Sequence, residues 1–159
     1  MTAQFPEILI IEGEERCMTF CPPIPAHPRI VEVDVETVAR EYPHVLSTGC
    51  WRGYIGVWEI KEGRLYLVGL RGRYKLEGDE PLFADWFTGV LRIPQGEMLH
   101  YVHMGFGSVY EQELHIKVEK GLVVKSRTID NRGKTFDEWE LHWRNLPGGE
   151  NRFPGDDQM

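Results

Sequence analysis

Apolar and polar residues alternate in short runs along most of this chain, as they do in β-strands that bury one face. The clearest run is 109–118. Its apolar residues Leu114, Ile116 and Val118 are expected to face inward, and its polar residues Glu113, His115 and Lys117 outward. Similar runs predict strands over 8–11, 16–20, 29–33, 54–60, 65–70, 74–76, 87–93, 99–104, 122–129 and 136–143. Short turns separate them, including Glu62-Gly63, 94–96 and 105–108.

A helical pattern occurs in one segment, 34–42. Asp34 can cap its N-terminus, Val35 and Val38 share a face, and Pro43 follows its end. Two turns of helix are too short to be stable alone, so this helix must pack against the sheet.

Many short strands and one short helix predict an all-β fold. We expect a single antiparallel domain, barrel-like or a curled sandwich, over residues 1–144. The segment 145–159 has no hydrophobic period and is predicted to be a disordered tail.

The hairpin within 50–72 is apolar on both faces. One face carries Tyr54, Trp58, Ile60, Leu65 and Leu67, and the other carries Ile55, Val57, Tyr66, Val68 and Leu70. A two-residue turn at Glu62-Gly63 would place Trp58 opposite Leu67. The second face could be covered by the helix or by loops, could line a ligand cavity, or could contact another chain.

Charge narrows the possible partners. The chain carries a net charge of −7, so it is expected to bind neither nucleic acid nor an anionic membrane surface. It shows no signal peptide and no apolar run of transmembrane length, which predicts a cytoplasmic protein. Its three cysteines, Cys17, Cys21 and Cys50, are expected to be thiols rather than zinc ligands or a disulfide.

Seven residues are candidates for a ligand-binding site inside the fold: Arg52, Tyr54, Trp58, Asp85, Arg92, His103 and Glu111. An arginine on an inward face must be paired, and Asp85, Glu59 or Glu111 could pair with Arg52 or Arg92. Such an arginine can also bind an anionic ligand. Asp85 precedes two aromatic residues, which fits either a turn pinned by aromatic packing or a pocket wall.

Acid–base chemistry would depend on His103 and the neighbouring strand. Across the predicted hairpin Glu111 can approach His103, which suits proton transfer but is also a common structural hydrogen bond. His100 and His103 would point to opposite faces of a strand, so no metal site is expected. The sequence shows no phosphate loop, nucleophile elbow or dinucleotide motif, and we expect no cofactor.

Two segments together are similar to known sequences. WRGYIGVWEIKEGRLYL and LFADWFTGVLRIPQGEMLHYVHMGFGSVYE resemble a group of small, functionally uncharacterised bacterial proteins that share the pattern WRGY…WEIK…LYL and ADWF…RIPQG…YVHMG. The resemblance covers about the middle half of the chain. It implies a bacterial origin and a compact single domain, and it implies no activity.

These observations favour a non-catalytic binding protein, such as an inhibitor, immunity or accessory factor that masks a protein partner. The alternative is a small-molecule-binding β-barrel with weak acid–base activity from His103, Glu111 and Asp85. The positions of the candidate polar groups inside the fold distinguish these two hypotheses, because a ligand site requires them to converge on one pocket.

Overall fold

The computed structural model describes residues 5–47, 49–50, 52–100 and 109–132. Strands dominate this part of the chain. They are β1 (Glu7–Ile11), β2 (Glu14–Met18), β3 (Ile30–Glu32), β4 (Tyr54–Lys61), β5 (Arg64–Gly72), β6 (Tyr74–Leu76), β7 (Leu82–Phe83), β8 (Gly89–His100), β9 (Val109–Glu119) and β10 (Leu122–Asp130). An α-helix, α1 (Val35–Glu41), and a 3₁₀ helix, η1 (Pro43–Leu46), precede β4.

The main sheet has eight strands and is mixed rather than antiparallel. Its order is β2-β1-β4-β5-β10-β9-β8, and β7 pairs with β5. The expectation of a purely antiparallel fold is wrong, because β1 runs parallel to β4. Between these two strands the chain passes through β2, β3 and α1, and such a crossover is what parallel neighbours require. β3 and β6 form a separate two-stranded sheet.

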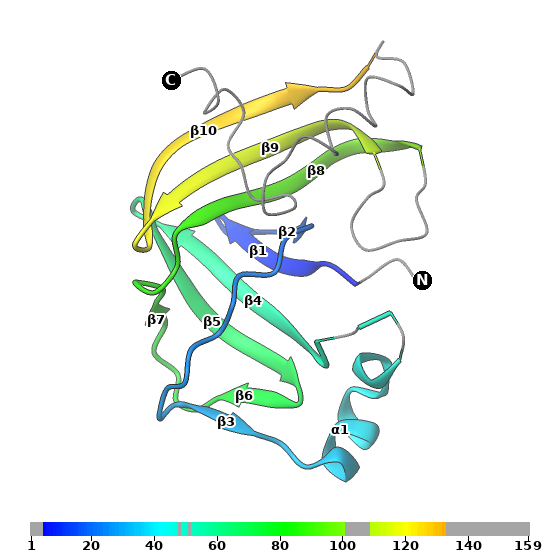
Figure 1. Ribbon diagram of the computed structural model, residues 1–159, viewed down its shortest axis with the longest axis vertical. Helices are drawn as coiled ribbons and strands as arrows, with labels where there is room; N and C mark the ends of the chain where they lie inside the picture. Colours follow the sequence, from blue (N-terminus) through cyan, green and yellow to red (C-terminus); the bar gives the residue numbers. More distant parts are fainter. Residues whose placement is uncertain (1–4, 48, 51, 101–108, 133–159) are drawn as a thin grey trace.

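The main sheet curls without forming a closed barrel among the described strands. Figure 1 shows β8, β9 and β10 lying over β1, β4 and β5. The two halves join narrowly, through a single register pair of Leu122 with Arg64. At the other edge, the backbone N–H of Thr19 donates to the carbonyl of Arg92 at 2.8 Å, so the ends of the sheet approach each other.

The main core lies between the two halves of the curled sheet. Strands from both halves contribute fully buried side chains, among them Leu9, Trp58, Leu67, Leu91 and Val118. Trp58 is the largest of the fully buried side chains. Its ring lies 6.2 Å from that of Trp86, which precedes β8.

The β4–β5 hairpin places its two apolar faces in different environments. Glu62 and Gly63 form the predicted turn, both with positive φ, and Trp58 pairs with Leu67 as expected. A bulge then shifts the register, so that Val57 pairs with Gly69 and not with Val68. The shift places Leu70 in the main core with Leu65 and Leu67, whereas simple alternation predicts it on the opposite face.

The outer face of this hairpin is covered in part by the helices. Ile55 packs in a second core with Val38 of α1, Val45 of η1 and Cys50. Nearer the turn, the ring of Tyr66 lies 5.8 Å from that of Phe83 in β7. The first of the three expected arrangements, cover by the helix and loops, therefore accounts for part of this face.

The predicted helix is confirmed. Asp34 is the N-cap, and its carboxylate accepts hydrogen bonds from the backbone N–H and the hydroxyl of Thr37, both at 2.8 Å. Val38 is the buried residue of α1 and carries the contact with the sheet.

Strand β8 differs from its prediction. It continues through Pro94 and Gln95, where the sequence predicts a turn. Both residues pair in register with β9, and a bulge follows between Gln95 and Met98, where Gly96 adopts a φ of 78°. The predicted loop 105–108, the strand 136–143 and the tail 145–159 lie outside the described residues.

Glu113 and His115 were expected to face outward from β9, but both are buried. The alternating residues Leu114 and Ile116 pack on the main core, so the face of β9 that carries Glu113 and His115 is enclosed as well. None of the described helices is long and apolar enough to cross a membrane.

Replacing Trp58 tests the assignment of the core. Trp58→Ala should lower the free energy of unfolding by about 3–5 kcal/mol, because it opens a large cavity and removes a hydrogen bond to a buried carboxylate. Chemical denaturation of both proteins measures the loss. Leu122→Ala, at an exposed position, is the control and should cost less than about 0.5 kcal/mol. A loss below about 1 kcal/mol for Trp58→Ala would contradict the assignment.

Candidate functional site

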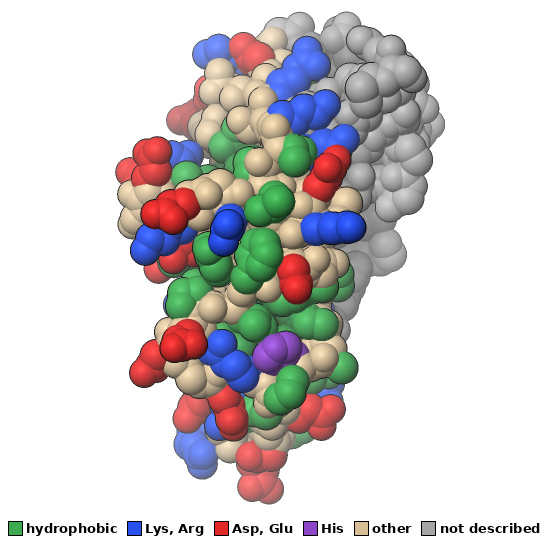
Figure 2. Space-filling model, turned by 90° about the vertical axis from the view of Figure 1, so that its left-hand side faces the viewer, with side chains coloured by type: hydrophobic (Ala, Val, Ile, Leu, Met, Phe, Trp, Pro, Cys, Tyr) green, Lys and Arg blue, Asp and Glu red, His purple; other side chains and the backbone are tan. Residues whose placement is uncertain are grey.

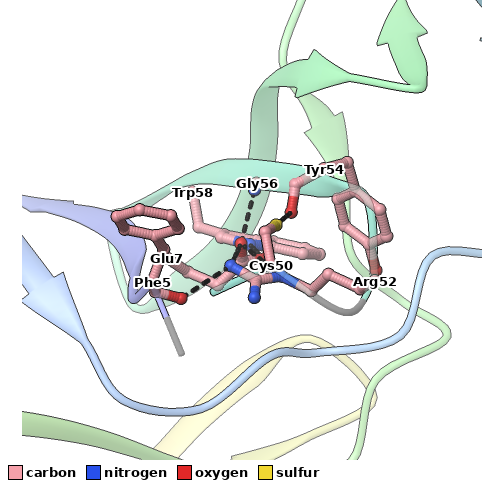
Figure 3. A network of polar contacts seen from close by, with 7 residues as sticks. All are labelled: Phe5, Glu7, Cys50, Arg52, Tyr54, Gly56 and Trp58. Carbon is pink, nitrogen blue, oxygen red and sulfur yellow. Dashed lines mark hydrogen bonds and ion pairs between the residues drawn. The ribbon is translucent and has the colours of Figure 1, made fainter. Parts of the chain in front are cut away.

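A buried carboxylate, that of Glu7, organises the polar interior beside β4. Glu7 has no exposed surface, and Figure 3 shows that the surrounding donors converge on it. Its Oε2 accepts from Arg52 Nη2 at 2.8 Å, from Arg52 Nε at 3.2 Å and from the Gly56 backbone N–H at 2.6 Å. Its Oε1 accepts from Trp58 Nε1 at 3.3 Å. Every hydrogen-bond contact is a donor, which suits an ionised carboxylate.

Two of the predicted site residues contact this carboxylate, and a third, Tyr54, lies beside one of them. Arg52 and Trp58 donate to Glu7, and the Arg52 guanidinium carbon lies 5.8 Å from the centre of the Tyr54 ring. The expected partners of Arg52, namely Asp85, Glu59 or Glu111, are wrong. The partner is Glu7 on the neighbouring parallel strand, an adjacency that the sequence does not indicate.

Sequence reasoning missed Glu7, although one signal was present. In the run EILII, Glu7 occupies the same alternating position as Leu9, whose side chain is in the main core. A charged residue at an inward position of an apolar strand must find donors inside the fold. Such a position marks a candidate polar centre.

Burial shifts the acid–base properties of this region. It raises the pKa of Glu7, an effect that Arg52 and the hydrogen bond from Gly56 partly offset. It also raises the pKa of Tyr54 to about 12, and the nearby charge of Glu7 adds to this shift. The pKa of Cys21 is raised to about 12 for the same two reasons. Tyr54 and Cys21 are therefore neutral near neutral pH and are not poised as a base or a nucleophile.

Arg92 belongs to a different polar cluster, on the other face of its strand. Leu91 and Ile93 point into the main core, and Arg92 between them points away from it. Its Nη2 lies 3.3 Å from Oε1 of Glu113, and both side chains are almost fully buried. Asn131 Nδ2 donates to Oε2 of the same carboxylate at 3.2 Å. Arg92 thus holds a carboxylate in place, again with a partner other than those predicted.

Of the remaining candidates, the two that the structure describes, Asp85 and Glu111, do not join either cluster. Asp85 is exposed in the turn before β8, where Trp86 Nε1 donates to the Pro23 carbonyl at 2.7 Å. This is the turn pinned by aromatic packing, not a pocket wall. Glu111 Oε1 accepts from the Glu97 backbone N–H at 3.2 Å and so supports the bulge of β8. His103 lies outside the described residues.

The described candidates therefore do not converge on one pocket. Asp85 and Glu111 lie at opposite ends of the β8–β9 pair, separated by roughly 20 Å of strand. Among the residues that the structure describes, no group of three or more His, Cys, Asp or Glu side chains could hold a metal ion.

A groove lies instead on the outer face of the sheet, where β1, β4 and β5 meet the helices. Its volume is about 570 Å³, and it is lined by Phe5, Pro6, Ile8, Tyr42, His44, Ile55 and Arg71. This volume falls in the range of ligand sites, and most of the lining is apolar or aromatic. The sequence did not indicate this site, because its lining comes from four separate segments.

The polar centre around Glu7 supports one wall of this outer groove. Arg52 Nη2 donates to the carbonyl of Phe5 at 3.0 Å, and the backbone N–H of Phe5 donates to the carbonyl of Gly49 at 2.7 Å. Phe5 is therefore held from both sides. Its ring packs edge-on against His44, with centroids 5.7 Å apart.

No family model, curated protein or solved structure matches this chain. The resemblance to the bacterial group described above stays a prediction.

Gly56 tests the close packing around the buried carboxylate. A Cβ at Gly56 would lie 2.5 Å from Glu7 Oε1 and 2.6 Å from Trp58 Nε1, so Gly56→Ala should cost about 1–3 kcal/mol of stability. Gly69→Ala on the neighbouring strand is the matched control, because its Cβ would meet only Val57 at 3.7 Å. Thermal or chemical unfolding measures both, and equal losses would refute this account of the Glu7 centre.

Alkylation tests the raised pKa of Cys21. All three cysteines are free thiols, with Cys17 exposed and Cys50 buried. At about pH 8, iodoacetamide should modify Cys17 well before Cys21, because a thiol with a pKa of about 12 is almost entirely protonated there. Between about pH 8 and pH 10, the rate at Cys21 should keep rising with the thiolate fraction. Tandem mass spectrometry localises the adduct, and a rate that levels off near pH 9 would disprove the raised pKa.

Proposed function

We propose that this protein is a non-catalytic interaction protein that binds a partner protein through the outer groove. The observation that carries the proposal is the groove itself, with its apolar floor and its aromatic wall of Phe5, His44 and Tyr42. An inhibitor, immunity or accessory factor acts through a surface of this kind. Rigid aromatic side chains are also the anchors that protein interfaces use most.

The pairing and separation of the polar candidates inside the fold support a binding protein over an enzyme. Arg52 and Arg92, which could have held an anionic ligand, are each engaged with a buried glutamate. The acid–base candidates Asp85 and Glu111 lie apart. A ligand pocket inside the curled sheet would need these groups to converge, and the described ones do not.

Exposed hydrophobic side chains favour a large partner over a small molecule. Phe5, Val35 and Leu46 are exposed by 39%, 55% and 43%, and they belong to the segments that flank the groove. The groove is open to solvent, so a small ligand would keep much of its surface in water. A protein surface could cover both the groove and its apolar rim.

Removing the aromatic wall tests the proposal. The double variant Phe5→Ala/His44→Ala should lose at least about tenfold of its affinity for any partner of the groove, since it removes two anchor side chains. The measurement is quantitative mass spectrometry of proteins retained by tagged wild type and variants from the native host. Affinity for each retained protein is then measured with purified components.

Leu122→Ala provides the control, because it also shortens an exposed hydrophobic residue but lies on β10. It should retain the same partner as wild type. A partner retained equally by all three proteins would show that binding occurs elsewhere, and the proposal would fail. Circular dichroism confirms that each variant is folded.

A further inference from the structure

The lining of the outer groove carries a positive charge and no negative charge. Arg71 is its cation, His44 adds ring nitrogens that can donate hydrogen bonds, and no Asp or Glu is among the lining residues. This contrasts with the whole chain, which has 25 acidic and 18 basic residues. Although the protein as a whole is acidic, the cation at this apolar groove favours a partner that carries negative charge.

Arg71 is available to a partner. It is exposed, and it pairs across the hairpin with Ile55, which forms part of the apolar lining. No described residue forms an ion pair or side-chain hydrogen bond with it, in contrast to Arg52 and Arg92. A guanidinium in this position can bind a carboxylate through two parallel hydrogen bonds.

From these observations we infer that the partner segment in the outer groove presents a carboxylate beside an aromatic or aliphatic side chain. The inference rests on the proposed binding function of the groove. The apolar side chain packs against Ile55 and the aromatic wall, while the carboxylate pairs with Arg71. Acidic residues flanked by an apolar anchor are thus the recognition chemistry that this surface fits.

The aromatic wall is ordered before binding. The ring of His44 packs edge-on against Phe5 on one side and against Tyr42 on the other, with centroids 6.4 Å apart for the second pair. Arg52 and Gly49 hold the Phe5 backbone. A wall fixed in this way loses little conformational entropy when a partner side chain docks.

A second exposed apolar surface lies on β10, where Leu122 and Val124 are exposed. Figure 2 shows the side of the molecule on the left of Figure 1, where hydrophobic side chains form a broken band with acidic and basic ones between them. Neither Leu122 nor Val124 lines the groove. The groove beside α1 combines an apolar floor with an available cation, so it defines a partner chemistry more closely.

Selection from random short peptides displayed on phage tests the inference. Wild-type protein should enrich peptides in which Asp or Glu lies next to an aromatic or aliphatic residue. Arg71→Glu should bind these peptides at least about tenfold more weakly and should instead enrich peptides with Lys or Arg at that position. Arg64→Glu is the matched control, since Arg64 is an exposed arginine at the other end of β5. It should keep the wild-type preference.

The outcomes separate the inference from the proposed function. Apolar peptides that bind wild type and Arg71→Glu equally, but not Phe5→Ala/His44→Ala, would leave the groove as the binding site and overturn the acidic preference. Peptides that bind all variants equally, or no enrichment at all, would overturn both. Reversal of the preferred charge in Arg71→Glu supports both.

Two further measurements test other occupants. If 4-phenylbutyrate, a small apolar carboxylate, binds wild type as tightly as the selected peptides and loses affinity in Arg71→Glu, the occupant is a small molecule and the protein-segment inference is overturned. If analytical ultracentrifugation shows a dimer that Arg71→Glu dissociates, the occupant is a second copy of this chain, which also overturns it. A monomer with weak phenylbutyrate binding supports a partner segment.

Discussion

The burial of one carboxylate, that of Glu7, constrains the whole N-terminal half of this protein. An ionised group without solvent costs several kcal/mol unless donors surround it. Here the donors come from β4 and from the segment before it, through Arg52, Gly56 and Trp58. β1 must therefore lie beside β4 in the register that presents these donors. This requirement joins the first strand to a hairpin that begins more than forty residues later.

The same centre links the core to the surface. Arg52 contacts the buried carboxylate and the carbonyl of Phe5 with one guanidinium group. Phe5 forms a wall of the outer groove, on the face of the sheet opposite the main core. A structural ion pair thus positions one wall of the groove that we propose as a binding surface. Under that proposal, the buried polar cluster affects binding through the position of Phe5 and without contact with the partner.

Two bulges decide which side chains face which way. The bulge between Val57 and Trp58 brings Leu70 into the main core, and the one after Gln95 lets β8 continue past Pro94. Each bulge adds one residue to a strand, so the side chains beyond it point to the opposite face from the one that simple alternation predicts. The proline is tolerated in β8 because this strand lies at the edge of the sheet.

Local patterning determined most of the elements. Alternation predicted the strands, Asp34 predicted the start of α1, and Glu62-Gly63 predicted the hairpin turn, because each depends on neighbouring residues alone. The sequence by itself also brought forward Arg52, Tyr54 and Trp58 as members of one site. Only the tertiary structure decided that Glu7 is their centre, that β1 pairs in parallel with β4, and that Arg71 borders an apolar groove. These features depend on contacts between distant segments, and alternation within a strand carries no information about which strand lies next to it.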